Sequence, residues 1–404
     1  MFPFLKKIFP QKADRPDAPV VIFDFGSRSV KLLLCRYRNE KVEVLAGRKV
    51  VYPQNAVDDD ELVDPAAIQP LLLESLAQLF EKKNLPHPIS AVVGIGGLGV
   101  SGYTSQIVYR RAKIQKTISD PEFKTILTRV EERAGQVMKK LIAWETASGN
   151  EPALINSEVL ELTVDGYAVA APIGSSGEKL SFTIYNAYTP GANHRRIVAL
   201  LSQLNCKVLS MSSSMYATLR SVMAARAEGL NALVIDIGAN ATEVGIIKEG
   251  RIIGHAGFEV AGDSFSSSIA SGLGKDPALG EELKLGYSAA KLPEEVQKEI
   301  RELVGFDCKV FFSGVKLLLE EFPGYSGMPE QVFLAGGGSL LPGVVSYLQA
   351  AMGQERADLK VDSVKALLPV DLRSFVDRTG RINSSADIAP LSVALDAADL
   401  LEEE

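Results

Sequence analysis

The sequence predicts an α/β protein built from two similar halves, with a small α+β insert in the first half. Two distant stretches carry nearly the same pattern: VVIFDFGSRSVKLLL begins at Val20, and ALVIDIGANATEVGIIKEG begins at Ala232. Each is an apolar run that ends in Asp-x-Gly, followed by a short polar turn and a second apolar run. This pattern is typical of a buried strand that turns tightly into its neighbour.

The first half predicts an α/β layer. A strand to Asp24, its continuation over Val30–Tyr37 and the segment Val42–Val51 alternate enough to form a meander. Apolar residues at helical spacing then predict a helix over Pro65–Lys83. The run AVVGIGG from Ala91 reads as a buried strand followed by a glycine-rich turn. The order β-β-β-α-β favours helices packed on a sheet.

The pattern of apolar and polar residues changes near residue 100, where the insert begins. Asp120-Pro121 predicts the start of a long helix, with the aspartate at the N-cap. Three strand-like segments follow, over Ser157–Val164, Gly166–Ala171 and Lys179–Thr189. We therefore expect one helix packed on a three-stranded sheet, with no recognisable catalytic cluster.

The second half returns to α/β. The expected elements are a helix from His194 to Asn205, a strand Cys206–Met211, helices Ser213–Glu228, Pro277–Leu285, Pro293–Phe322 (broken at Gly305) and Leu391–Leu401, and a serine-rich helix capped by Gly262-Asp263. The run VFLAGGGSLLPGVVSYL from Val332 predicts a strand, a triple glycine and a helix.

Composition excludes several classes of function. The chain has 404 residues, 46% of them hydrophobic, which suits two or three globular domains. The net charge of −7 argues against a general nucleic-acid surface. The three cysteines and the three histidines are scattered and form no metal-binding pattern. We expect the cysteines to be buried thiols in a reducing cytoplasm. The segment MFPFLKKIFPQK could lie on an anionic membrane, dock to a partner or form a frayed tail.

The paired Asp-x-Gly turns predict a phosphate and metal site. Asp24 or Asp236 alone could be a turn cap, but together they suit Mg²⁺ held through water. Backbone N–H groups of residues 26–28 and 238–240 can bind phosphate oxygens. Lys31 and Arg28 could pair with phosphate or be solvated.

The third glycine motif is Gly336-Gly337-Gly338-Ser339, which removes side chains where a base or ribose could lie against the backbone. No Walker loop and no dinucleotide fingerprint occur in the sequence. Following two Asp-x-Gly hairpins in this order, the triple glycine indicates a nucleotide site.

This order of motifs resembles the actin and sugar-kinase ATPase superfamily, and more narrowly its bacterial FtsA/PilM group. The resemblance covers the chain from about Val20 to Leu401, and DIGANATEVGIIKEGRI and GEELKLG match motifs of that group. It implies a two-lobed actin-like (ribonuclease H-like, duplicated) ATPase fold with an inserted SHS2-type subdomain, and it implies ATP and Mg²⁺ as cofactors. The residues implied at the nucleotide are Gly26, Ser27, Arg28, Lys31, Gly238, Asn240, Thr242, Gly262, Asp263, Glu281, Lys284, Gly336, Gly337, Gly338 and Ser339, with Asp24 and Asp236 at magnesium. By structure alone, Glu281 and Lys284 would pass as an exposed helical pair.

The resemblance also implies a domain division. Residues 1–19 would be a tail, 20–99 and 192–229 the first lobe (1A), 100–191 the insert (1C) and 230–386 the second lobe (2A/2B), with helix 387–404 packed on the first lobe. The chain departs from the family at one place. Relatives commonly carry a glutamate that orients the attacking water, and the aligned position in this chain falls near Ser210. A serine cannot act as a carboxylate base, so we expect nucleotide binding with weak ATPase activity at most.

Three functions follow as hypotheses. The first is a PilM-like cytoplasmic scaffold of type IV pilus assembly that docks the cytoplasmic tail of an inner-membrane, PilN-like protein. The second is an FtsA-like division protein that polymerises and tethers the division ring to the membrane. The third is a sugar or acetate kinase. Such an enzyme would need a catalytic carboxylate, and the insert offers no obvious candidate. The sequence GANAT in the second turn and the acidic segment DAADLLEEE favour the first hypothesis, the pilus scaffold. Self-association stays open, and no nucleic-acid partner is expected.

Overall fold

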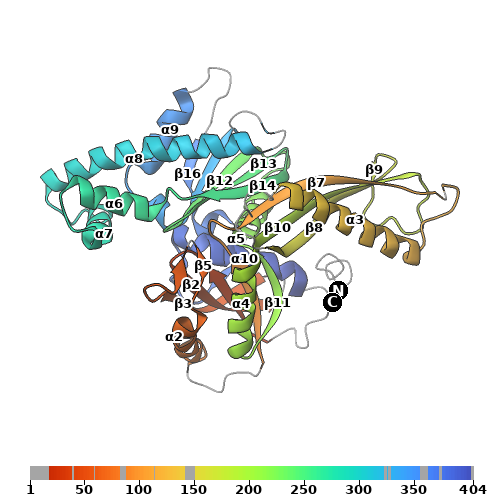
Figure 1. Ribbon diagram of the computed structural model, residues 1–404, viewed down its shortest axis with the longest axis horizontal. Helices are drawn as coiled ribbons and strands as arrows, with labels where there is room; N and C mark the ends of the chain where they lie inside the picture. Colours follow the sequence, from red (N-terminus) through yellow and green to blue (C-terminus); the bar gives the residue numbers. More distant parts are fainter. Residues whose placement is uncertain are drawn as a thin grey trace.

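Two mixed β-sheets form the body of the protein (Figure 1). The computed structural model describes residues 18–38, 41–58, 60–81, 88–112, 114–141, 151–322, 325, 329–354, 363–372 and 375–401. In spatial order, the strands of the first sheet are β11 (Cys206–Ser213), β6 (Ile89–Ile95), β1 (Val20–Phe25), β2 (Ser29–Arg38), β3 (Lys41–Val51) and β17 (Val376–Asp377). The predicted tail up to residue 17, and with it the amphipathic N-terminal segment, lies outside the described residues.

The second sheet is longer because the insert extends it. In spatial order, its strands are β16 (Ser363–Ala366), β15 (Gln331–Ala335), β12 (Ala232–Ile237), β13 (Thr242–Lys248), β14 (Arg251–Phe258), β7 (Ser101–Arg110), β10 (Lys179–Pro190), β8 (Pro152–Val164) and β9 (Tyr167–Ala168). A separate small hairpin is made by β4 (Val57–Asp58) and β5 (Glu61–Leu62).

The two sheets share one five-strand pattern. The order β11-β6-β1-β2-β3 in the first sheet corresponds to β16-β15-β12-β13-β14 in the second. In each, the strand that carries the Asp-x-Gly motif pairs in parallel on one side and antiparallel on the other. The registers also agree, because Asp24 lies opposite Lys31 and Asp236 lies opposite Glu243. This duplication confirms the predicted two-lobed architecture.

The helices cover these sheets and fill the space between them. They are α2 (Pro65–Leu79), α3 (Asp120–Leu141), α4 (Gly191–Gln203), α5 (Ser214–Ala224), α6 (Gly262–Gly272), α7 (Gly280–Ser288), α8 (Glu294–Glu321), α9 (Val344–Gln354) and α10 (Ile388–Leu401). Helix α10 packs on β1, β2 and β6 of the first sheet, α5 reaches β12, β13 and β14 of the second, and the two helices contact each other. Among the described residues, no helix is both long and apolar enough to cross a membrane.

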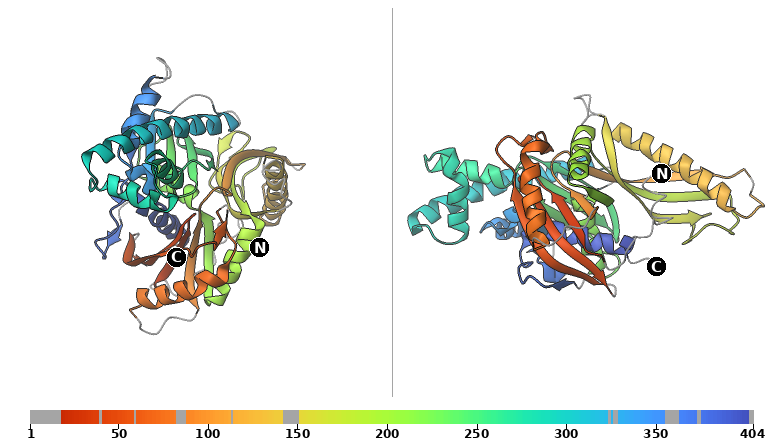
Figure 2. Two further views of the ribbon diagram at one scale, coloured as in Figure 1. Left: turned by 60° about the vertical axis from the view of Figure 1, so that its left-hand side comes forward. Right: turned by 90° about the horizontal axis from the view of Figure 1, so that it is seen from below.

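The insert is a small layer with its own core. Helix α3 packs on β7 and β10 through a cluster of buried apolar residues: Ile107, Ile118, Phe123, Ile126, Leu127, Val130, Ala134, Val164, Leu180, Phe182 and Ile184. The sheet has four strands rather than the expected three, because β7 joins it along β10. Polar residues on the partly exposed face of β7 hide its alternation in the sequence. Figure 2 shows the insert projecting away from the two lobes.

The insert is tied to the second lobe by main-chain pairing. Strand β7 lies antiparallel to β14, with Tyr103 opposite Gly254 and Gly102 opposite His255. The hydroxyl of Thr104 also donates to the carbonyl of Ile252 at 2.6 Å. The insert therefore follows the first lobe in the chain but extends the sheet of the second.

Several predicted boundaries are wrong. Helix α8 runs unbroken through Gly305, since the cost of one glycine, about 1 kcal/mol, is outweighed by the buried face of a long helix. Helices α2 and α5 end earlier than expected, at Leu79 and Ala224. Helix α3 includes Asp120, and the hydroxyl of Ser119 instead accepts from the N–H of Glu122. A 3₁₀ turn over Gly337–Leu340, which contains two of the three glycines, precedes α9.

Candidate functional site

The two Asp-x-Gly turns have the same local geometry. In the first turn the N–H of Gly26 donates to the carbonyl of Ser29 at 3.1 Å. In the second the N–H of Gly238 donates to the carbonyl of Ala241 at 3.0 Å. Each turn follows a buried strand and leads into an antiparallel partner, so both turns lie at the ends of their sheets, closed by the N–H of their glycine. Such concave turns suit phosphate oxygens.

The turns meet across the boundary between the two lobes. The backbone N–H of Asn240 donates to the hydroxyl of Ser27 at 3.2 Å, joining residues 213 positions apart in the chain. The side chain of Asn240 donates to Asp60 at 3.0 Å. The structure thus brings together the two hairpins that the sequence placed in one site.

Asp24 and Asp236 hold matching positions in the two sheets and lie near enough for their charges to interact. Burial raises the pKa of Asp236 to about 6, Lys31 opposes this rise, and the negative charge of Asp24 adds to it. Burial likewise raises the pKa of Asp24, whose carboxylate accepts from the hydroxyl of Ser214 at 2.6 Å. Two carboxylates that disfavour each other's charge suit a divalent cation between them. Within the described residues, no group of three or more His, Cys, Asp or Glu side chains is arranged to ligate a metal directly.

Charge is distributed unequally between the two walls of the site. In the first sheet, Asp24, Lys31 and Lys49 follow one another across three strands. In the second sheet, the corresponding row is Asp236, Glu243 and Gly257. The first lobe therefore supplies cations where the second supplies a carboxylate, and a bound polyanion would find its positive partners on the first lobe.

Lys49 lies opposite Lys31 beside the candidate site, and the sequence analysis did not single it out. Burial lowers its pKa, and the nearby charges of Lys31 and Arg28 lower it further. Lys31 itself is held by the carbonyl of Ala386 at 2.6 Å, just before α10. Lys49 could have been found from the sequence only by aligning β2 with β3, which places it opposite Lys31.

Arg28 spans the site from the first lobe to the second. Its guanidinium donates to Asp263 at the start of α6 and lies 3.6 Å from Glu281 on α7. Glu281 also pairs with Lys284 at 2.8 Å, and Lys284 donates to the carbonyl of Gly262 at 2.8 Å. These residues therefore form one charged network, which the sequence suggested only through the family resemblance.

The triple-glycine loop closes another side of the site. At Gly336 φ is +79°, and its N–H donates to the carbonyl of Ser385 at 3.1 Å. A Cβ at Gly336 would overlap Asp236 and the backbone of Ile237, and a Cβ at Gly338 would lie 2.9 Å from the Cβ of Ile237. A Cβ at Gly337 would meet nothing within 4 Å. Only Gly337 of the three thus opens onto space that a ligand could occupy.

Two predicted hydroxyls are already bonded to the backbone. The hydroxyl of Thr242 donates to the carbonyl of Val260 at 2.8 Å, and that of Ser339 donates to the carbonyl of Gly336 at 2.7 Å. Both residues are buried. Their hydroxyls stabilise the turns that surround the site.

Glu243 and Asp60 join the site without having been singled out from the sequence. Glu243 accepts from the N–H of Gly97 at 3.0 Å, and Asp60 accepts from the N–H of Leu98 at 2.8 Å. Burial and the charge of Asp236 raise the pKa of Glu243 well above its usual value. The signal that could have found Glu243 is its place seven residues after Asp236, which matches the place of Lys31 after Asp24.

Behind Glu243 lies a buried polar contact. Its Oε1 is 3.9 Å from Nδ1 of His255, and Nε2 of His255 is 2.9 Å from the hydroxyl of Ser213. Burial lowers the pKa of His255 to about 3, which keeps the ring neutral.

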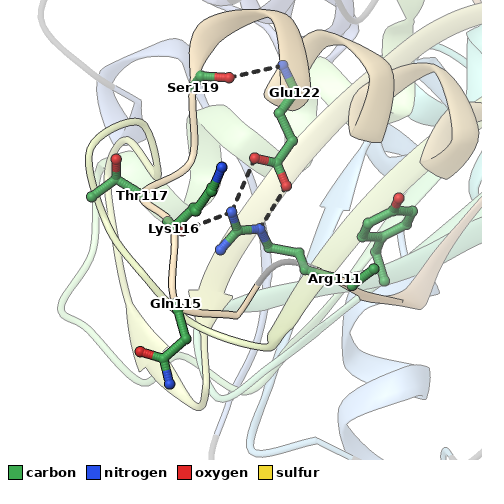
Figure 3. A pocket seen from close by; sticks show the side chains of 8 residues that line it. Arg111, Gln115, Lys116, Thr117, Ser119 and Glu122 are labelled. Carbon is green, nitrogen blue, oxygen red and sulfur yellow. Dashed lines mark hydrogen bonds and ion pairs between the residues drawn. The ribbon is translucent and has the colours of Figure 1, made fainter.

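A separate open pocket lies on the insert (Figure 3). The guanidinium of Arg111 pairs with Glu122 at 2.8 Å and donates to the carbonyls of Gly177 and Lys116, both at 2.9 Å. These bonds use four of the five N–H donors of Arg111 and neutralise the Glu122 carboxylate. The ion pair therefore stabilises the wall of this open pocket.

The duplicated sheets, the meeting turns and the inserted layer define a two-lobed actin-like fold. Over 95% of this chain and 99% of the other, it superimposes on the PilM–PilN type IV pilus biogenesis complex with a TM-score of 0.63 and 16% identity. It also superimposes on EutJ, an ethanolamine utilization protein of Carboxydothermus hydrogenoformans, over 97% and 95% of the two chains (TM-score 0.51, 14% identity).

Two curated sequences also align with the chain. The cell division protein FtsA of Streptococcus pneumoniae is 23% identical over 348 residues, 82% of this chain and 73% of the relative. FtsA of Pseudomonas aeruginosa is 26% identical over 122 residues, 30% of this chain and 29% of the relative. No protein-family model matches. The chain thus has the actin-like fold of the FtsA/PilM type, which confirms the resemblance found in the sequence.

Proposed function

We propose that the chain is an actin-like scaffold that binds ATP with Mg²⁺ between its two lobes. The observation that carries this proposal is the meeting of the two turns, where the N–H of Asn240 donates to the hydroxyl of Ser27 and Asp24 lies near enough to Asp236 for its charge to raise the Asp236 pKa. The turns would hold the phosphates through backbone N–H groups, and the two aspartates would hold Mg²⁺ through water. Gly337 would lie against the adenosine.

Binding of Mg-ATP by isothermal titration calorimetry tests this proposal. We expect Asp236→Ala and Gly337→Arg to weaken binding strongly, because one removes a metal carboxylate and the other fills the open space. Gly135→Arg is the matched control, since Gly135 is equally open but lies on α3 of the insert. Wild-type affinity in both site variants would contradict the proposed site.

We infer further that hydrolysis is slow or absent. Ser210 lies on β11 opposite Val92 and carries no carboxylate. Single-turnover measurements should show that bound ATP is cleaved slowly or not at all. Rapid phosphate release would contradict this inference.

The domain division proposed from the sequence is supported by the buried cores. The largest apolar cluster is centred on the first lobe and α10 and continues into the second sheet at Val234 and Phe333, a second cluster lies mainly in the second lobe, and a third lies in the insert. We propose residues 20–99 and 192–229 as lobe 1A, 100–191 as subdomain 1C and 230–386 as lobe 2A/2B, with the exception of β17, which pairs with β3 in the first sheet. Helix α10 would belong with the first lobe.

We propose that the scaffold docks an extended cytoplasmic tail of an inner-membrane pilus assembly protein along strand β8, which would place the protein in the cytoplasm at that membrane. Strand β8 pairs with β10 along its length, but on its other side it pairs only with β9, at Thr163 and Val164, within the described residues. A strand edge of this kind offers N–H and C=O groups to an extended peptide. The PilM–PilN complex, a solved structure of similar fold, supports this choice of partner.

Amide hydrogen exchange tests the docking surface. A synthetic peptide of the partner's cytoplasmic tail should protect the outward amides of β8 between residues 157 and 162. Amides of α8, at the far end of the second lobe, serve as the internal control. Binding without protection of β8 would contradict this docking site while leaving the nucleotide proposal intact.

The alternative is an FtsA-like division protein that polymerises and tethers the division ring. The alignment with FtsA of Streptococcus pneumoniae over 82% of the chain favours it. The genes beside this one distinguish the two roles, since pilus genes and division genes occur in different clusters. Nucleotide-dependent filaments seen by electron microscopy would support the division role.

A further inference from the structure

Arg28 connects the first Asp-x-Gly turn to two helices of the second lobe. It lies between β1 and β2, and its guanidinium donates to Asp263 at the start of α6. A second guanidinium nitrogen lies 3.6 Å from Glu281 on α7. One side chain of the first lobe therefore bridges to both helices of the second lobe at the edge of the proposed nucleotide site.

The two carboxylates are unequal partners for Arg28. Glu281 also accepts from Lys284 and from the hydroxyl of Ser266, each at 2.8 Å. Its charge is therefore shared among three donors. Asp263 makes the direct hydrogen bond, and burial raises the pKa of its carboxyl while Arg28 opposes this rise. Asp263 is thus the principal acceptor that holds the guanidinium.

A phosphate group would be a stronger acceptor than Asp263. The backbone N–H groups of residues 27 and 28 would place phosphate oxygens beside the Arg28 side chain, because Arg28 belongs to the same turn, whose Gly26 N–H already donates to Ser29. A guanidinium matches a phosphate with two parallel hydrogen bonds. The ion pair with Asp263 is about one-third exposed on the aspartate side, so solvent weakens it.

We propose that Arg28 is a latch between the lobes, held by Asp263 and Glu281 and released by the phosphate of a bound nucleotide. This inference rests on the proposed function and deepens it. The latch makes Asp263 a competitor of the ligand for Arg28. It also makes release specific for ligands that carry phosphate, because adenosine offers no group that can take over the guanidinium.

The test is a double-mutant cycle measured by titration calorimetry with Mg-ATP and with adenosine. Asp263→Asn should tighten Mg-ATP binding roughly fivefold, because an exposed ion pair of up to about 1 kcal/mol no longer competes. Arg28→Gln should weaken Mg-ATP binding about tenfold or more, since charge-assisted bonds to phosphate are lost. In the double variant, Asp263→Asn should have no further effect.

The controls separate the latch from a general change of charge. Glu282→Gln removes the same charge from the next residue of α7 and should leave Mg-ATP affinity unchanged. Adenosine affinity should not respond to Arg28→Gln. Unchanged or weaker Mg-ATP binding by Asp263→Asn would overturn the latch while leaving the nucleotide site standing. A wild-type protein that fails to bind Mg-ATP would overturn both.

Discussion

Replacing Gly336 by alanine should destabilise the protein, while the same replacement at Gly337 should not. Gly336 has a φ of +79°, in the left-handed region. A Cβ there would overlap Asp236 Oδ1 and the carbonyl oxygen of Ile237, and would lie 2.8 Å from the carbonyl carbon of Ile237. At Gly337 a Cβ would meet nothing within 4 Å.

The expected magnitude has two parts. At φ +79° and ψ 167° the backbone lies in a region that essentially only glycine adopts, and another residue there costs roughly 1–3 kcal/mol. Overpacking against a rigid backbone adds roughly 1–3 kcal/mol. The free energy of unfolding of Gly336→Ala should therefore fall by about 2–6 kcal/mol. For Gly337→Ala the change should stay within about 0.5 kcal/mol, as for substitutions away from packed features.

Urea denaturation followed by circular dichroism measures the two free energies, and calorimetry with Mg-ATP measures binding. Gly337→Ala should weaken Mg-ATP binding in a protein of unchanged stability, because its methyl group points into the proposed adenosine site. Equal stability of the Gly336→Ala and wild-type proteins would refute the assigned loop conformation. Wild-type Mg-ATP affinity in Gly337→Ala would place the adenosine elsewhere.

Three further predictions concern charge. Because burial raises the pKa of Asp236 to about 6, its carboxylate must lose a proton before it can hold Mg²⁺; Mg-ATP affinity measured by calorimetry should therefore rise with pH and be roughly tenfold weaker at pH 5 than on the plateau above pH 7. Lys49→Gln should weaken Mg-ATP binding severalfold at low salt and less at high salt, whereas Lys41→Gln at the start of β3 should have no effect; equal losses would contradict a specific role. Burial lowers the pKa of His255 from 6.5 to about 3, so the unfolded chain binds the extra proton between these values. The free energy of unfolding should fall with decreasing pH in this window, by up to about 1.4 kcal/mol per pH unit, and His255→Gln should lack this contribution in urea titrations.

Local patterns predicted the elements that carry the proposed site. The strands that end in Asp24 and Asp236 were predicted because an apolar run before Asp-x-Gly is a local signal, and both strands lie where expected. The long helix from Asp120 was predicted from its 3.6-residue period. The fourth insert strand β7 was missed because its partners β10 and β14 are distant in sequence.

The sequence by itself determined the repeated hairpins, the glycine loop and the two-lobed α/β class, because these depend on residues close together in the chain. The tertiary structure decided which side chains share the site. Arg28 and Asp263 are 235 positions apart, and Ser27 and Asn240 are 213 apart. Lys49 becomes visible only through strand register. Such contacts depend on how the two sheets pack around α5 and α10, and no local propensity encodes that packing.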